Sequence, residues 1–173
     1  DLAGSMSTEE TIILAEGVTD QDGLLETQFN YGKLAEIIGL TSQQEMQIDG
    51  NLVELGTLDG MRQIYRQAGK PDIARADIDI NQFDPKTVAF LNALGRALFA
   101  DKPLMEGLAE YNLWVNDNMN EETISGVMFD ILDKRNDVVI DSLLKTLPRY
   151  ETIIIPWGAM HMPAIEQAVL AAG

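Results

Sequence analysis

The sequence predicts an α/β fold in which a mainly parallel sheet is flanked by helices. Two apolar runs, residues 11–15 and 152–155, indicate strands that are buried on both faces, as in parallel sheets. Between them lie several segments with apolar residues at helical spacing. With 173 residues and a hydrophobic content of 46%, the chain can bury a substantial core, and we predict a single domain over residues 1–173.

Charge and composition argue against several functions. The chain has 12 Lys and Arg residues against 28 Asp and Glu residues, and its net charge of −16 disfavours binding to nucleic acids and to anionic membranes. It has no cysteine and one histidine, so it cannot form a zinc site of the usual Cys/His kind alone. Because no run of about 18 apolar residues occurs, we predict no transmembrane segment.

The first predicted strand lies in "TIILAEGV" and ends at Glu16. In open α/β sheets, binding and catalytic sites gather at the carboxyl ends of the strands, so Glu16 is a candidate site residue. It equally suits the first solvated residue of a loop, and both interpretations stay open.

The segments that follow are typical of helices that pack on the sheet. We predict a helix in "YGKLAEIIGL", a further helical turn from Thr41 and a helix over residues 59–67. The alternation in "IARADIDI", residues 73–80, then predicts an edge or exit strand with one polar face. Its polar face would carry Arg75, Asp77 and Asp79.

Residues 84–118 are predicted to form an apolar helical hairpin inserted in the α/β chain. Asp84 and Pro85 are a typical N-cap and first helical residue, and a second helix follows Pro103. The hairpin suits additional core, a lid, a contact between copies in a homo-oligomer, or a patch on a membrane surface.

The segment "NEETISGVMFDILDKRNDVVIDSLLKTL" predicts one long helix with a single apolar stripe. Arg135 and Asn136 fall on this stripe. A buried guanidinium keeps its proton, so Arg135 must meet a carboxylate, a carbonyl cluster or an anionic ligand. Alternatively, it lies at the border of the stripe and extends to water. The stripe is made of Ile124, Val127, Met128, Ile131, Leu132, Val138, Val139, Ser142 and Leu143.

His161 is the only histidine and lies between the strand at 152–155 and a predicted helix that begins near Pro163. Gly158 begins a turn between them. A helix N-terminus disfavours the imidazolium, which leaves a neutral ring suited to bind a ligand or act as a general base. The alternative is a histidine packed beneath the loop with both nitrogens hydrogen-bonded.

Three short motifs resemble those of the TraB/PrgY/GumN and TIKI group. They are "LAEG" after an apolar strand, "DKRND" in a late helix and "IIIPWGAMHMPAIEQAVLAAG" at the end. The resemblance implies an erythromycin-esterase-like or ChaN-like fold with a polar site at the carboxyl edge of the sheet. The site residues of this pattern correspond to Glu16, Arg135, Asn136, Gly158 and His161.

The resemblance implies one of two functions. TIKI-like members suggest metal-dependent hydrolysis of peptides, with Glu16, Arg135 and His161 as catalytic residues and with Glu16 and His161 as ligands of a divalent metal ion. PrgY-like and ChaN-like members suggest a module that binds a peptide or small molecule without catalysis.

The chain departs from the family pattern at one point. The pattern has a first Gly-x-x-His ahead of the Glu-bearing strand, and only "DLAGSMSTEE" precedes Thr11 here. Either the chain is a fragment without that β unit, or this member has lost half of the paired-histidine site. We expect weak metal binding or none from two protein ligands, with Glu16 and His161 at the same end of the sheet. We also expect a largely buried Arg135 within salt-bridge reach of Glu16 or another site carboxylate.

Overall fold

The computed structural model describes residues 11–27, 47–48, 51–52 and 58–173, which divide into two compact units. Unit 1 is formed by described residues of segments 1–19, 56–78 and 131–173, and unit 2 by those of segments 20–55 and 79–130. The helices predicted within residues 31–44 lie outside the described residues.

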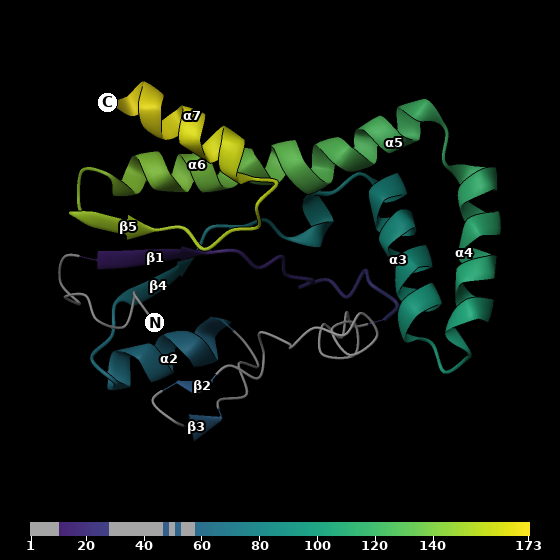
Figure 1. Ribbon diagram of the computed structural model, residues 1–173, viewed down its shortest axis with the longest axis horizontal. Helices are drawn as coiled ribbons and strands as arrows, with labels where there is room; N and C mark the ends of the chain where they lie inside the picture. Colours follow the sequence, from purple (N-terminus) through teal and green to yellow (C-terminus); the bar gives the residue numbers. More distant parts are fainter. Residues whose placement is uncertain (1–10, 28–46, 49–50, 53–57) are drawn as a thin grey trace. The chain divides into compact units, whose positions relative to one another are not determined.

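Unit 1 is built on a three-stranded parallel sheet of order β4-β1-β5 (Figure 1). The strands are β1 (Thr11–Ala15), β4 (Asp72–Arg75) and β5 (Thr152–Ile154). In the register, Ile13 pairs with Ile73 on one side and with Ile154 on the other. The predicted mixed α/β class is therefore confirmed. The central strand β1 is buried along its length, whereas β5 is half-buried at an edge.

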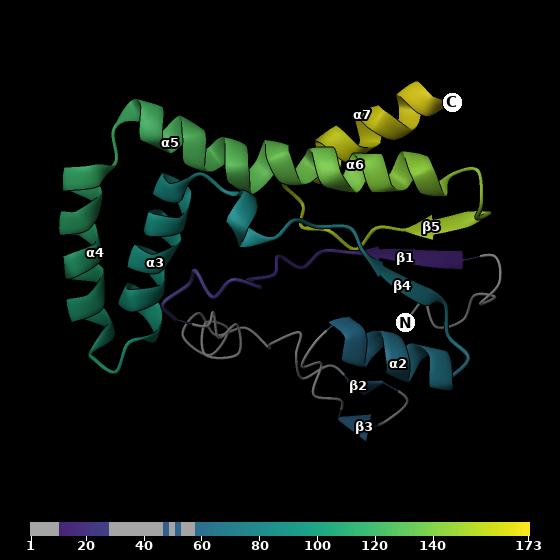
Figure 2. The same cartoon turned by 180° about the vertical axis from the view of Figure 1, so that it is seen from behind.

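Helices lie on both sides of this sheet. Figures 1 and 2 draw α6 (Arg135–Thr146) and α7 (Met162–Ala172) on one side and α2 (Leu58–Gln67) on the other. Burial of each large aliphatic side chain contributes about 1.5–3 kcal/mol to such a core. The core on the α6 side consists of Ile12, Leu14, Ala76, Val139, Leu143, Trp157 and Ile165.

The prediction of an edge strand within residues 73–80 is confirmed by β4, which lies at an edge of the described sheet, but the predicted polar face is wrong. The strand β4 ends at Arg75, and the side chains of Asp77 and Asp79 are buried. Asp79 caps a short 3₁₀ helix, η3 (Ile80–Gln82), by accepting a hydrogen bond from the Asn81 N–H. The alternation therefore reflects two buried aspartates whose carboxylates accept backbone hydrogen bonds, and not a solvated face.

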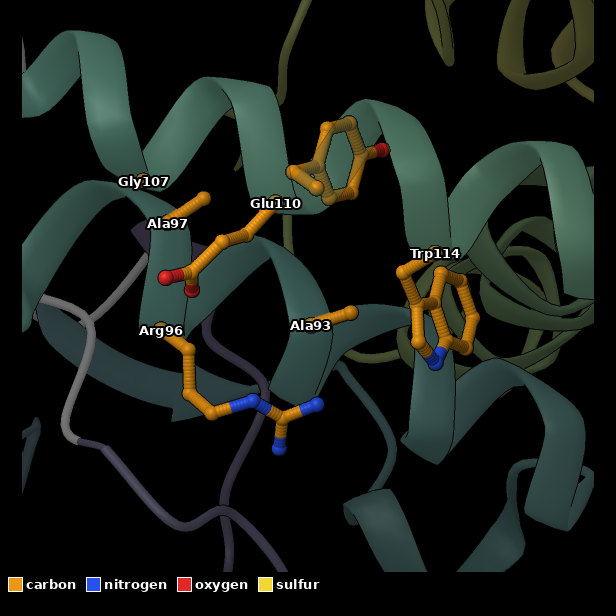
Figure 3. A pocket seen from close by; sticks show the side chains of 7 residues that line it. Ala93, Arg96, Ala97, Gly107, Glu110 and Trp114 are labelled. Carbon is orange, nitrogen blue, oxygen red and sulfur yellow. The ribbon is translucent and has the colours of Figure 1, made fainter.

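Unit 2 contains α3 (Pro85–Phe99), α4 (Leu104–Asn118), α5 (Glu121–Met128) and the short antiparallel strands β2 (Gln47–Ile48) and β3 (Asn51–Leu52). Asp84 caps α3 as predicted, because its side chain accepts from the Lys86 N–H. α3 and α4 pack closely at Gly107, where an added Cβ would lie 2.3 Å from the Ala97 carbonyl oxygen. Trp114 and Glu110 line a hollow of about 160 Å³ between the two helices (Figure 3).

Residues 121–146 are helical throughout but do not carry the single predicted stripe. α5 is followed by a π-helix, η4 (Phe129–Lys134), and then by α6. Ile124 and Met128 are exposed. A π turn takes up more residues than an α turn, so the buried face changes phase between α5 and α6. The buried residues of this segment are Thr123, Val127, Asp130, Asn136, Val139, Leu143 and Thr146.

Across the described part of the chain, no helix has both the length and the apolar character needed to span a membrane.

Candidate functional site

The candidate site lies in unit 1, where the chain leaves the carboxyl end of β1. Glu16 follows β1 directly, and a third of its side chain is exposed (33%). Its Oε1 accepts a hydrogen bond from Arg135 Nη2 at 2.7 Å, and its Oε2 accepts from the Gly158 N–H at 2.9 Å. The predicted contact between Arg135 and Glu16 is therefore present, and both carboxylate oxygens are held.

A second carboxylate, Asp77, completes the surroundings of Arg135. Asp77 Oδ1 and Oδ2 accept from Arg135 Nε at 3.0 Å and Nη2 at 2.7 Å. The same carboxylate also accepts from the Gly17 N–H at 2.8 Å and the Ile78 N–H at 2.9 Å. Four donors thus compensate a side chain with 0% exposure. The alternating pattern of residues 73–80 predicted Asp77 on a polar strand face, so this role was not predicted.

The backbone brings Asp77 and Glu16 together. Beyond the ladder of β1 and β4, the Ala76 N–H still donates to the Ala15 carbonyl, and the Thr19 N–H donates to the Ile78 carbonyl. The two chain segments after these strands therefore run side by side, and each places one carboxylate at the same end of the sheet. Arg135, at the start of α6, joins the two carboxylates.

The Arg135 guanidinium is largely buried, with 11% of the side chain exposed. Burial acts to lower the pKa of Arg135, but the hydrogen bonds and charges of Asp77 and Glu16 outweigh it and raise the pKa above its ordinary value. The side chain therefore stays cationic. With two carboxylates and one guanidinium, the cluster has one net negative charge when His161 is neutral.

His161 lies at the N-cap of α7 and is buried. Its Nδ1 lies 2.8 Å from Asn136 Oδ1. Because an amide oxygen only accepts hydrogen bonds, Nδ1 carries the proton, and Nε2 of the neutral ring keeps its lone pair. That Nε2 lies 3.9 Å from Glu16 Oε1, so the two predicted residues share one end of the sheet.

The pKa of His161 lies below its ordinary value of 6.5. Burial is the largest cause and the positive charge of Arg135 the second, while the charges of Glu16 and Asp77 act in the opposite direction. The lowered pKa supports the predicted neutral imidazole. Its causes are burial and the charge of Arg135, whereas the sequence suggested the helix N-terminus as the cause.

Gly158 contributes its backbone N–H and not its conformational freedom. A Cβ at this position would meet Glu16 Oε2 at 3.7 Å and His161 Cδ2 at 3.8 Å, which are ordinary contacts. The Gly-x-x-His turn therefore brings one donor to Glu16 and one imidazole to Asn136.

The donor atoms suit a divalent metal ion in type but not in number. A neutral imidazole nitrogen and a carboxylate oxygen are common ligands, and catalytic zinc sites generally use three protein ligands. In the part of the chain that the structure describes, no group of three or more His, Cys, Asp or Glu side chains could hold a metal ion. Glu16 and His161 would need a further ligand from outside the described residues.

Comparison with protein-family models, with curated proteins and with solved structures finds no match to this chain. The resemblance to the TraB/PrgY/GumN and TIKI group therefore rests on its motif residues.

Proposed function

We propose that this chain is a metal-dependent hydrolase of the TraB/TIKI type that acts on peptides, with its active centre at Glu16, Arg135 and His161. The observation that supports the proposal is the separation of 3.9 Å between His161 Nε2 and Glu16 Oε1. Two acceptor atoms at this distance do not bond to each other, so they suit a shared third species, either a metal ion or a water molecule.

Glu16 and His161 would hold the divalent ion, together with a ligand from outside the described residues. When bound, the ion would activate a water molecule for attack on a peptide carbonyl. Asn136 fixes the tautomer of His161 through Nδ1, as outer-shell partners of metal-binding histidines do. Arg135 and the Gly158 N–H orient the Glu16 carboxylate. The charge of Arg135 would also stabilise negative charge that develops on the carbonyl oxygen.

The alternative is a binding or regulatory module of the PrgY/ChaN type. The observation that favours it is the count of donors, because two protein ligands can contribute to ligand binding without a catalytic metal. Such a module would bind a peptide or small molecule and release it unchanged.

Hydrolysis of an internally quenched peptide library in the presence of Mn²⁺, Co²⁺ or Zn²⁺ tests the proposal. We expect metal-dependent cleavage that EDTA abolishes and that Glu16→Gln and His161→Gln each remove. Glu166→Gln is the matched control, because Glu166 is an exposed glutamate on α7. Cleavage that survives in the site variants contradicts the proposal. Binding of the same peptides without cleavage, measured by fluorescence anisotropy, supports the alternative.

The resemblance also leads us to propose an erythromycin-esterase/ChaN-like arrangement with residues 84–118 as an inserted helical hairpin. This hairpin would support a homo-oligomer, since Met105 and Leu113 on α4 are exposed apolar side chains. Light scattering of the protein and of the Met105→Glu/Leu113→Glu variant tests this. We expect an oligomer that the double substitution dissociates, and a monomeric wild type contradicts the proposal.

A further inference from the structure

Trp157 lies in the turn between β5 and α7, one residue before Gly158, and only 7% of it is exposed. The backbone N–H of Trp157 donates to the Ile155 carbonyl at 2.9 Å, and this hydrogen bond closes the turn. The residue is thus fixed at the backbone between the strand end and the donor that holds Glu16.

The indole contacts two side chains of the site, the Arg135 guanidinium and the neutral His161 imidazole. Arg135 Cζ lies 5.2 Å from the centre of the Trp157 ring, within cation–π range. The His161 ring centre lies 5.0 Å away at an interplanar angle of 88°, an edge-to-face contact. One side chain therefore contacts the guanidinium and the imidazole, which have no hydrogen bond to each other among those found in the described residues.

The buried indole nitrogen of Trp157 lowers the free energy of unfolding. Nε1 is buried and has no hydrogen-bond partner in the described structure, whereas buried tryptophan N–H groups usually find one. An unsatisfied buried donor loses its hydration without compensation. Trp157 belongs to the hydrophobic core, but a phenyl ring could fill part of the same position without this donor, so packing does not explain the N–H.

Two contacts explain why a tryptophan stands at position 157. Tryptophan offers the strongest cation–π face of the aromatic side chains, and its two fused rings are large enough to contact Arg135 and His161 together. Arg135 must be held because the same Nη2 donates to Asp77 and to Glu16.

We propose that Trp157 is a positioning residue of the site, which holds the Arg135 guanidinium and the His161 imidazole in place through its indole ring. Its indole N–H, which has no partner among the described residues, lowers the stability of the fold. The inference rests on the proposed function for the assignment of the site, but its test has readouts that require no catalysis.

The unpaired N–H can be observed directly in the wild type. The chain has two tryptophans, so a ¹⁵N spectrum shows two indole N–H signals, and Trp114→Phe assigns them. We expect the Trp157 signal to exchange slowly with solvent, because it is buried, and to lie upfield, because it has no acceptor. A downfield signal typical of a hydrogen-bonded indole would overturn the claim of an unpaired donor.

The positioning role is tested by Trp157→Phe, with Trp114→Phe as the matched control in unit 2. The single histidine gives one set of imidazole signals without ambiguity. In Trp157→Phe we expect a folded protein with an unfolding midpoint that is unchanged or higher, and loss or broadening of the Nδ1–H signal. The control should leave that signal intact. If Trp157→Phe does not fold, Trp157→Tyr is measured in the same way.

Unchanged imidazole signals in the folded variant would overturn the positioning role. A midpoint that falls further than in Trp114→Phe would overturn the claim that the fold does not need the indole. Where cleavage is measurable, we expect kcat to fall about 10- to 100-fold with little change in KM, as for other outer-shell residues. If the wild type cleaves no peptide and Trp157→Phe still shows the expected changes in the imidazole signals, the proposed function is contradicted and the positioning role is supported.

Discussion

Among the described residues of unit 1, two arginine–aspartate pairs have nearly equal two-atom geometry in different surroundings, and Asp72 of the first pair also accepts from Arg66 Nη2 at 3.1 Å. Arg62 donates to Asp72 through Nε at 3.0 Å and Nη2 at 3.2 Å, and Arg135 donates to Asp77 through the same atoms at 3.0 Å and 2.7 Å. The first pair is partly solvated, with side-chain exposures of 40% and 31%, whereas those of the second are 11% and 0%.

The difference shows that contact geometry alone does not set the energetic role of an ion pair. A solvated pair typically contributes about 0–1 kcal/mol, because water replaces either partner readily. A buried pair has lost its hydration, so removal of one partner leaves an uncompensated charge. The Arg135–Asp77 pair is therefore best understood as a constraint that holds Arg135 beside Glu16.

The largest expected effect is that of Arg135→Ala. It leaves Asp77 buried without its cation, so we expect a loss of about 3–5 kcal/mol in the free energy of unfolding. Urea denaturation followed by circular dichroism measures it, with the exposed Arg149→Ala as control. An unchanged denaturation midpoint would reject the buried-pair interpretation.

A double replacement sharpens the same point. The double variant Arg135→Met/Asp77→Leu lacks both buried charges, so we expect it to be markedly more stable than either single variant. Glu16 loses a partner in the double variant, but it is partly exposed to water. Strictly additive losses in this double-mutant cycle would show that the two side chains do not compensate each other.

His161 predicts the sign of a pH dependence. Its pKa is lowered in the folded protein, so below pH 6.5 the unfolded chain takes up a proton that the folded chain does not. Its contribution to stability is therefore fully present above pH 6.5 and is lost as the pH falls toward the folded pKa. We expect His161→Gln to flatten the decline of the unfolding free energy in this interval, and an identical decline in both proteins would contradict the shift.

The smallest effect is expected at the solvated pair. Arg62→Ala should cost about 0.2–1 kcal/mol and less at high salt. The hydrogen bond from Arg62 is the largest cause that lowers the pKa of Asp72 to about 2. Its contribution is present above pH 3.8 and is lost as the pH falls toward 2. Acid titration of unfolding at low and high salt measures it, and a cost similar to that of Arg135→Ala would remove the contrast between the pairs.

Local patterns predicted β1, β4 and β5, the helix start at Asp84 and the contact of Arg135 with a site carboxylate. These features depend on apolar runs, on cap chemistry and on the need of a buried guanidinium for a carboxylate. Asp77 was missed because its burial depends on Arg135, which lies 58 residues away in the chain. The phase change at Phe129–Lys134 was missed because a π turn leaves little mark on the apolar pattern.

The central claim is that a neutral His161 faces the Glu16 carboxylate in one polar site. NMR titration of the single imidazole tests it most directly, because no other histidine contributes a signal. We predict an Nδ1–H tautomer at pH 7 and a pKa below 6.5, which Glu16→Gln lowers further because the Glu16 charge raises it. A pKa at or above 6.5 that does not respond to Glu16→Gln would contradict the claim.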